Sequence, residues 1–147
     1  MKIYISSSWK NRDRVRIMAQ TLENLGQIVF DFTNEKKRKY PICPPEKYPE
    51  QFDPEKHIYS EYILNGDWLS VVNENRYEIE HCDLIILMLP CGIDATADWA
   101  YGVGCGKPSL ICGNPPKGER SPVHLWANKI FNTDEELIKY LKKIGIN

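Results

Sequence analysis

The stretch Asp83-Leu84-Ile85-Ile86-Leu87-Met88-Leu89-Pro90 decides the fold class of this 147-residue chain. Its central residues are all apolar, and no polar residue interrupts them. A strand with one face in water alternates apolar and polar residues, whereas a strand covered on both faces reads as a continuous apolar run. The stretch therefore predicts a central strand of a parallel sheet that carries helices on both faces.

The residues before this strand predict a strand–helix–strand unit. Lys2 to Ser6 and Gln27 to Phe32 are short, partly β-branched segments typical of strands, and Asp31 lies at the carboxyl end of the second. Between them, apolar residues recur at helical spacing at Val15, Met18, Ala19, Leu22 and Leu25. Gly26 then ends the helix. Such a unit normally forms a right-handed parallel crossover.

The residues after the central strand continue the alternation. Residues 94–104 are rich in small side chains and predict a helix packed closely on the sheet. Ser109 to Cys112 predicts a buried strand and Lys129 to Phe131 a short edge strand. Thr133-Asp134-Glu135-Glu136 forms a capping box at the start of a last helix. We therefore expect a single α/β domain, residues 1–147, with a doubly wound, flavodoxin-like, mainly parallel five-stranded sheet between two helical layers.

Residues 33–58 interrupt this pattern and predict a long, proline-rich loop insert. The basic run Lys36-Lys37-Arg38-Lys39 within it is typical of solvated surface. Residues 59–80 read as helical, with a break near Asn65-Gly66.

Composition and charge exclude several function classes. The 19 basic and 20 acidic residues give a net charge of -1, which argues against binding of a nucleic-acid polymer. No apolar run approaches the roughly 18–20 residues that span a bilayer, so we expect no membrane association. The N-terminal residues resemble a strand and not a signal peptide, and the five cysteines include no C-x-x-C pair. These features predict a cytoplasmic protein with reduced thiols.

Neither a cofactor nor a metal is indicated. The chain lacks a phosphate-binding G-x-x-x-x-G-K-[ST] loop and the glycine-rich dinucleotide fingerprint. Its three histidines, His57, His81 and His124, are scattered along the sequence, which gives little support to metal-dependent hydrolysis.

Ligands of doubly wound sheets bind beyond the carboxyl ends of the strands. This rule nominates Ser6 to Asn11, the residues around Asp31, and the loop from Pro90 to Asp98, which includes Gly92. Asp94 and Asp98 are spaced to face the same side of a first helical turn, where the helix dipole and free N–H groups keep carboxylates ionised. An ionised carboxylate in a pocket can attack the anomeric carbon of a glycoside. From their spacing alone, the two residues fit ordinary helix-capping acids better than catalytic groups.

The loop after the first strand also offers ligand contacts. The hydroxyls and amides of Ser6, Ser7 and Ser8 precede a helix and can hold a phosphate or a sugar. Trp9 fits two roles equally well, stacking on a nucleobase or covering the core.

Two segments resemble the nucleoside 2-deoxyribosyltransferases and the related deoxynucleoside 5'-monophosphate N-hydrolases. Ile3-Tyr4-Ile5-Ser6-Ser7-Ser8-Trp9 resembles the family's first strand and loop. Asp83-Leu84-Ile85-Ile86, followed by Asp98-Trp99-Ala100-Tyr101-Gly102-Val103-Gly104-Cys105-Gly106-Lys107-Pro108, resembles its central strand and nucleophile helix. Asp98 stands where the family has its catalytic Glu, and Asn75 stands where the transferases often carry Asp.

The resemblance implies cleavage of an N-glycosidic bond in a small nucleoside or nucleotide, by hydrolysis or base exchange. Asp98 would form a covalent glycosyl intermediate, and Tyr4 would hold its carboxylate. Asp94 and Asn75 would lie near the base, and Ser6 to Ser8 with Trp9 would line the sugar or phosphate side. The resemblance also implies a homodimer or larger assembly in which a neighbouring chain completes the site.

Two other functions remain open from the sequence. One is a non-catalytic nucleotide-binding or sensing domain, in which Asp98 only accepts hydrogen bonds. The other is a TIR-like domain that cleaves NAD, which is compatible with the Ile5-Ser6-Ser7-Ser8 segment and with Phe30-Asp31. The substrate that is turned over distinguishes them.

Overall fold

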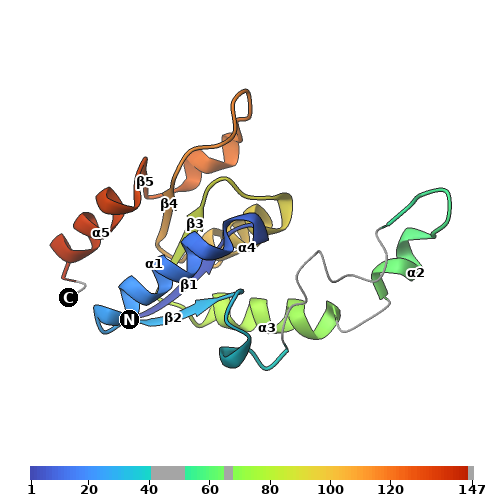
Figure 1. The fold of residues 1–147 in the computed structure, drawn as a ribbon, viewed down its shortest axis with the longest axis horizontal. Coiled ribbons are helices and arrows are strands. Elements are labelled where there is room, and N and C mark those ends of the chain that lie inside the picture. Colours follow the sequence, from blue (N-terminus) through green and yellow to red (C-terminus); the bar gives the residue numbers. More distant parts are fainter. Residues whose placement is uncertain (41–51, 65–67, 146–147) are drawn as a thin grey trace.

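The computed structural model describes residues 1–40, 52–64 and 68–145, and these residues build one parallel sheet with helices on both faces (Figure 1). The strands are β1 (Lys2–Ser6), β2 (Ile28–Asp31), β3 (Leu84–Met88), β4 (Ser109–Cys112) and β5 (Lys129–Phe131). The α-helices are α1 (Arg12–Asn24), α2 (Tyr59–Leu64), α3 (Trp68–Glu80), α4 (Ile93–Gly104) and α5 (Asp134–Lys143).

The strand order is β2-β1-β3-β4-β5, and every neighbouring pair is parallel. This is the flavodoxin-like order, so the predicted fold class is confirmed. The predicted central strand, β3, lies in the middle of the sheet and is buried along its whole length. Strand β2 pairs with one side of β1, and β3, the next strand along the chain, pairs with the other side. The strand order therefore reverses between β1 and β3.

Each face of the sheet carries its own core. On one face, α1 and α5 cover the strands with Val15, Met18, Leu22, Leu137 and Leu141. On the other face, α3 and α4 contribute Ile79, Ala95 and Trp99, and the odd–even alternation of β1 directs Tyr4 to this second core. The register pairs Tyr4 with Ile85, so the phenol lies under α4 near the centre of the sheet.

The small residues of α4 allow the close packing that the sequence predicts. A Cβ atom added at Gly102 would lie 2.8 Å from Cδ1 and 3.3 Å from Cγ2 of Ile85, so a larger side chain there would require Ile85 or the helix to shift. Trp99, one turn earlier, is completely buried. α4 is therefore held at a fixed height over β1 and β3.

The insert is described only in part, because its centre, residues 41–51, lies outside the described residues together with the predicted break at Asn65-Gly66. Directly after the insert, α2 has no buried residue and projects away from the sheet (Figure 1). The prediction that the basic run is solvated is wrong for Arg38, which is only 6 % exposed. In the described ranges, no helix is long and apolar enough to cross a membrane.

Candidate active site

A pocket of about 450 Å³ opens at the carboxyl end of β1, next to the loop that follows β3. The strand order reverses at this point, which is where doubly wound sheets bind their ligands. All the predicted site residues except one line it: Tyr4, Ser6, Ser7, Ser8, Trp9, Asn75, Gly92, Asp94 and Asp98. The tertiary structure thus gathers residues from β1, α3 and α4 into one cavity.

Serine hydroxyls at this pocket form hydrogen bonds that join the end of β1 to neighbouring elements. Ser6 donates a hydrogen bond to the Ala95 carbonyl at 2.9 Å, which ties the end of β1 to α4. Ser7 donates to the Met88 carbonyl at 2.7 Å and accepts a hydrogen bond from the Asn11 amide. The hydroxyl hydrogens of both serines are therefore engaged within the protein, and only their oxygens and the backbone remain for a ligand. Ser8 instead caps the short 3₁₀ turn Trp9–Asn11.

The Asp98 carboxylate is held by two side chains from two different elements. The Tyr4 hydroxyl of β1 and the Asn75 amide of α3 both donate to Oδ2 of Asp98, each at 3.0 Å. Both bonds end on the same oxygen, so Oδ1 takes part in neither. A carboxylate fixed through one oxygen keeps the other available for reaction with a bound molecule.

Burial raises the pKa of the Asp98 carboxyl above its ordinary value. The hydrogen bonds from Tyr4 and Asn75 oppose this rise, the nearby Asp94 adds to it, and the charge of Arg38 lowers it. Burial, followed by the proximity of Asp98, also raises the pKa of Tyr4 well above its usual value. Tyr4 is therefore a protonated hydrogen-bond donor throughout the working pH range.

These findings correct the electrostatic argument made from the sequence. Asp94 lies in the first turn of α4, as predicted, but Asp98 lies one turn further along the helix. Free N–H groups at the helix start are out of its reach. The hydrogen bonds from Tyr4 and Asn75 take the place of the helix terminus in favouring the ionised form of Asp98.

Aromatic and apolar side chains form one wall of the pocket. Trp9 meets Phe32 edge to face at 5.2 Å and also packs against the core on the α1 face. Trp9 thus lines the pocket and also touches the core, and its predicted stacking on a nucleobase stays a prediction. Trp68 and Val72 from α3 line the same cavity.

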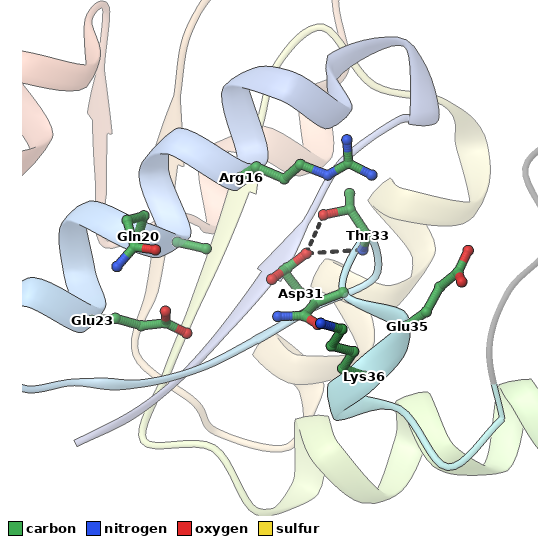
Figure 2. Close-up of a pocket in the computed structure, with 9 residues that line it drawn as sticks. Arg16, Gln20, Glu23, Asp31, Thr33, Glu35 and Lys36 are labelled. Atoms are coloured by element: carbon green, nitrogen blue, oxygen red, sulfur yellow. Dashed lines mark hydrogen bonds between the residues drawn. The ribbon is translucent and has the colours of Figure 1, made fainter.

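Asp31 lies apart from this site. It is 2 % exposed on the α1 face of the sheet, and its Oδ1 accepts hydrogen bonds from the backbone N–H and the hydroxyl of Thr33. Figure 2 shows it in a separate pocket against α1, below Arg16. The expectation that Asp31 belongs to the main site is wrong, because consecutive residues of a strand face opposite sides and Asp31 follows Phe30 of the second core.

Arg38, Phe32 and Trp68 are not among the residues predicted for the site. The Nη2 of Arg38 donates to the side-chain amide oxygen of Asn75 at 2.9 Å. The isolated arginine inside a lysine-rich run was its only signal. Phe32 ends the predicted second strand and Trp68 lies in the predicted helical segment 59–80, but no local pattern links either one to the site.

A metal site is not found in the described ranges, which contain no group of three or more His, Cys, Asp or Glu side chains positioned to hold an ion. The described residues that line the pocket include two carboxylates, Asp94 and Asp98.

No protein-family model matches the chain. No curated protein matches it either. Among solved structures, a CMP N-glycosidase from Clostridium botulinum is 13% identical, with a TM-score of 0.57 over 97% of this chain and 99% of that one. A 2-deoxyribosyltransferase from Bacillus psychrosaccharolyticus is 18% identical, with a TM-score of 0.57 over 93% of this chain and 90% of that one.

A conserved protein from Enterococcus faecalis is 8% identical, with a TM-score of 0.59 over 97% of this chain and 98% of that one. At such identities the likeness shows a shared fold, and the function must be argued from the site.

Proposed function

We propose that this protein cleaves the N-glycosidic bond of a nucleoside, by hydrolysis or base exchange, with Asp98 as the nucleophile. One observation carries the proposal: the Asp98 carboxylate lines the pocket at the strand reversal and is oriented through a single oxygen by Tyr4 and Asn75. The fold is shared with an N-glycosidase and a deoxyribosyltransferase, whose names denote chemistry at this kind of bond.

The reaction proceeds in two displacements. Oδ1 of Asp98 attacks the anomeric carbon of the sugar, the bond from that carbon to the base nitrogen breaks, and a glycosyl ester forms. The electron pair leaves with the base, which takes up a proton. Asp94, one turn earlier on the same side of α4, is the second carboxylate among the described lining residues, and we assign it to relay this proton from water to the base. Water or the nitrogen of a second base then attacks the anomeric carbon and gives up a proton to Asp94, while the bond from that carbon to Oδ1 breaks and releases the Asp98 carboxylate.

The charge of the pocket favours a nucleoside over a nucleoside 5'-monophosphate. Its lining residues, among those described, include the carboxylates of Asp94 and Asp98 but no lysine or arginine. A phosphate group would meet two like charges without a paired cation. The aromatic wall formed by Trp9, Phe32 and Trp68 suits an uncharged base, because bases stack on aromatic side chains.

Exposed apolar side chains next to the pocket support a homo-oligomer. Leu69 on α3 is 69% exposed, and Ile93 at the start of α4 is 88% exposed. Apolar patches of this kind commonly become buried against another chain. Light scattering coupled to size exclusion tests this: a mass of two or more chains is expected, and a Leu69→Asp variant should shift it toward one. A monomeric parent protein would refute it.

The function is tested by chromatographic detection of free base. The full chain is incubated with ribo- and deoxyribonucleosides, their 5'-monophosphates and NAD, with and without a second base as acceptor. We expect release from nucleosides, and loss of release in Asp98→Ala. Asp13→Ala is the matched control, since Asp13 is an exposed acid on α1 whose side chain is 86% exposed.

The other outcomes are equally informative. Turnover by Asp98→Ala at the parent rate would remove Asp98 as the nucleophile. Release of nicotinamide from NAD alone would favour a TIR-like activity. Ligand-induced stabilisation without any base release would make the domain a binder.

A further inference from the structure

The insert places one buried cation behind the Asp98 carboxylate. The Arg38 side chain is 0% exposed, and its guanidinium lies 5.1 Å from the centre of the Phe30 ring, which in turn stacks on Tyr4 at 5.4 Å. Its Nε donates to the Tyr40 carbonyl, and its Nη2 meets Glu74 at 3.2 Å. Arg38 is therefore held rigidly against the elements that carry Tyr4 and Asn75.

Arg38 decides which way the Asn75 amide points. A guanidinium can only donate hydrogen bonds, so the atom of Asn75 that faces it must be the carbonyl oxygen. The Oδ1 of Asn75 does accept from Arg38 at 2.9 Å, which leaves the Nδ2 group to donate to Asp98 at 3.0 Å. Without Arg38 the Asn75 oxygen loses the donor that fixes it, and the amide can rotate away from Asp98.

The charge of Arg38 acts on Asp98 as well. The titratable and charged groups that face this carboxyl are Tyr4 from β1, Asp94 from its own helix and Arg38 from the insert, and Glu74 of α3 accompanies Arg38. Of these, Arg38 is the group whose charge favours the ionised form of Asp98.

We propose that Arg38 is a positioning residue for the Asp98 carboxylate, acting through the Asn75 amide, so that the start of the insert sets the reactivity of the pocket. The meaning of this role for catalysis rests on the proposed function, whereas the coupling of Arg38 to Asp98 does not.

The alternative to this proposal is a purely structural role, in which Arg38 only anchors the start of the insert through Glu74 and the Tyr40 carbonyl. The two roles differ in what they predict, because an anchor would alter the melting temperature and leave the titration of Asp98 unchanged.

The test follows the Asp98 side-chain carboxyl by carbon-13 NMR during a pH titration of the full chain. Arg38→Gln keeps hydrogen-bonding capacity but removes the charge, and Arg38→Lys restores the charge. The control is Arg76→Met, which changes the residue after Asn75 on α3 and removes a side chain that is 58% exposed. We expect a raised Asp98 pKa in Arg38→Gln, recovery in Arg38→Lys and no change in the control.

Activity is measured on the same samples. In Arg38→Gln we expect kcat at neutral pH to fall about tenfold, the equivalent of one hydrogen bond, with KM within about twofold of the parent. An unchanged Asp98 titration in a folded Arg38→Gln protein would overturn the proposal. If Asp98 responds to Arg38 but no substrate is turned over, the positioning role stands and the proposed function fails.

The unaltered protein supplies a second measurement in case Arg38→Gln does not fold. The Nε–H resonance of Arg38 and the Nδ2 resonances of Asn75 should shift with the same midpoint as the Asp98 carboxyl. Their failure to move over that pH range would also overturn the proposal.

Discussion

Replacement of Tyr4 by phenylalanine removes one hydrogen bond from Asp98 and changes little else. The ring stays stacked on Phe30, and the Asn75 amide still donates to the carboxylate. A hydrogen bond to a charged group contributes about 1.5–3 kcal/mol, and each 1.36 kcal/mol is about a factor of ten in rate. In the parent protein this hydrogen bond stabilises the ionised form of Asp98. Its removal should therefore raise the pKa of Asp98 further above the ordinary value.

The expected result of Tyr4→Phe is a pH-dependent loss of activity. On the acid side of the profile kcat/KM should fall by about 10- to 150-fold, because more of the nucleophile is protonated. The deficit should shrink as the pH rises and Asp98 ionises again. The assay is base release across a pH series, with circular dichroism to confirm that the variant is folded.

Tyr101→Phe is the matched control for this experiment. Tyr101 lies on α4, like Asp98, and its hydroxyl also donates to a carboxylate, that of Glu80. Its hydroxyl makes no contact with the pocket-lining carboxylates, so the pH profile should stay that of the parent. A Tyr4→Phe enzyme with the parent profile would refute the argument that the phenol sustains the ionised nucleophile.

Three further predictions concern stability and binding. Burial raises the pKa of Asp98 in the folded state, so the folded protein favours the protonated carboxyl. The stability that depends on this protonated form is fully present below about pH 4 and is lost as the pH rises through the folded pKa of Asp98. Asp98→Asn should therefore gain stability relative to the parent as the pH rises, and urea unfolding that shows a constant difference would contradict this. Asp134, paired with Arg14 at 2.5 Å, has a lowered pKa, chiefly through that hydrogen-bonded pair. Asp134→Asn should lower the free energy of unfolding by about 1–2 kcal/mol at neutral pH, and the deficit should fade as the pH drops through the folded pKa of Asp134; a deficit that persists in acid would speak against the pair. Trp9→Ala should raise KM about 5- to 100-fold, as expected for a base-stacking side chain, and an unchanged KM with a lowered Tm would make Trp9 a core residue only.

The local signals in the sequence were sufficient for the fold. An uninterrupted apolar run identified β3, and helical spacing followed by Gly26 identified α1 and its end. The capping box at Thr133 identified the start of α5, where the Thr133 hydroxyl accepts from the Glu136 N–H. Each of these signals acts over a few residues, so it can be read without knowledge of the distant chain.

Site residues that follow the carboxyl end of a strand could be predicted from the sequence, whereas the other residues of the site could not. The rule that ligands bind at the carboxyl ends of strands nominated Ser6 to Trp9 and Asp98, and these residues meet in one pocket. The same rule wrongly included Asp31, because it ignores which face of the sheet a residue occupies.

What the sequence by itself determined is the alternation of strands and helices and the identity of the carboxylates at the strand ends. Only the tertiary structure decided the environment of Asp98, because its partners come from positions far away in the chain. Tyr4 is 94 residues from Asp98, Asn75 is 23 residues away, and Arg38 lies 37 residues before Asn75. Hydrogen bonds and buried charges act over a few ångströms in space, and a sequence records order along the chain but not those distances.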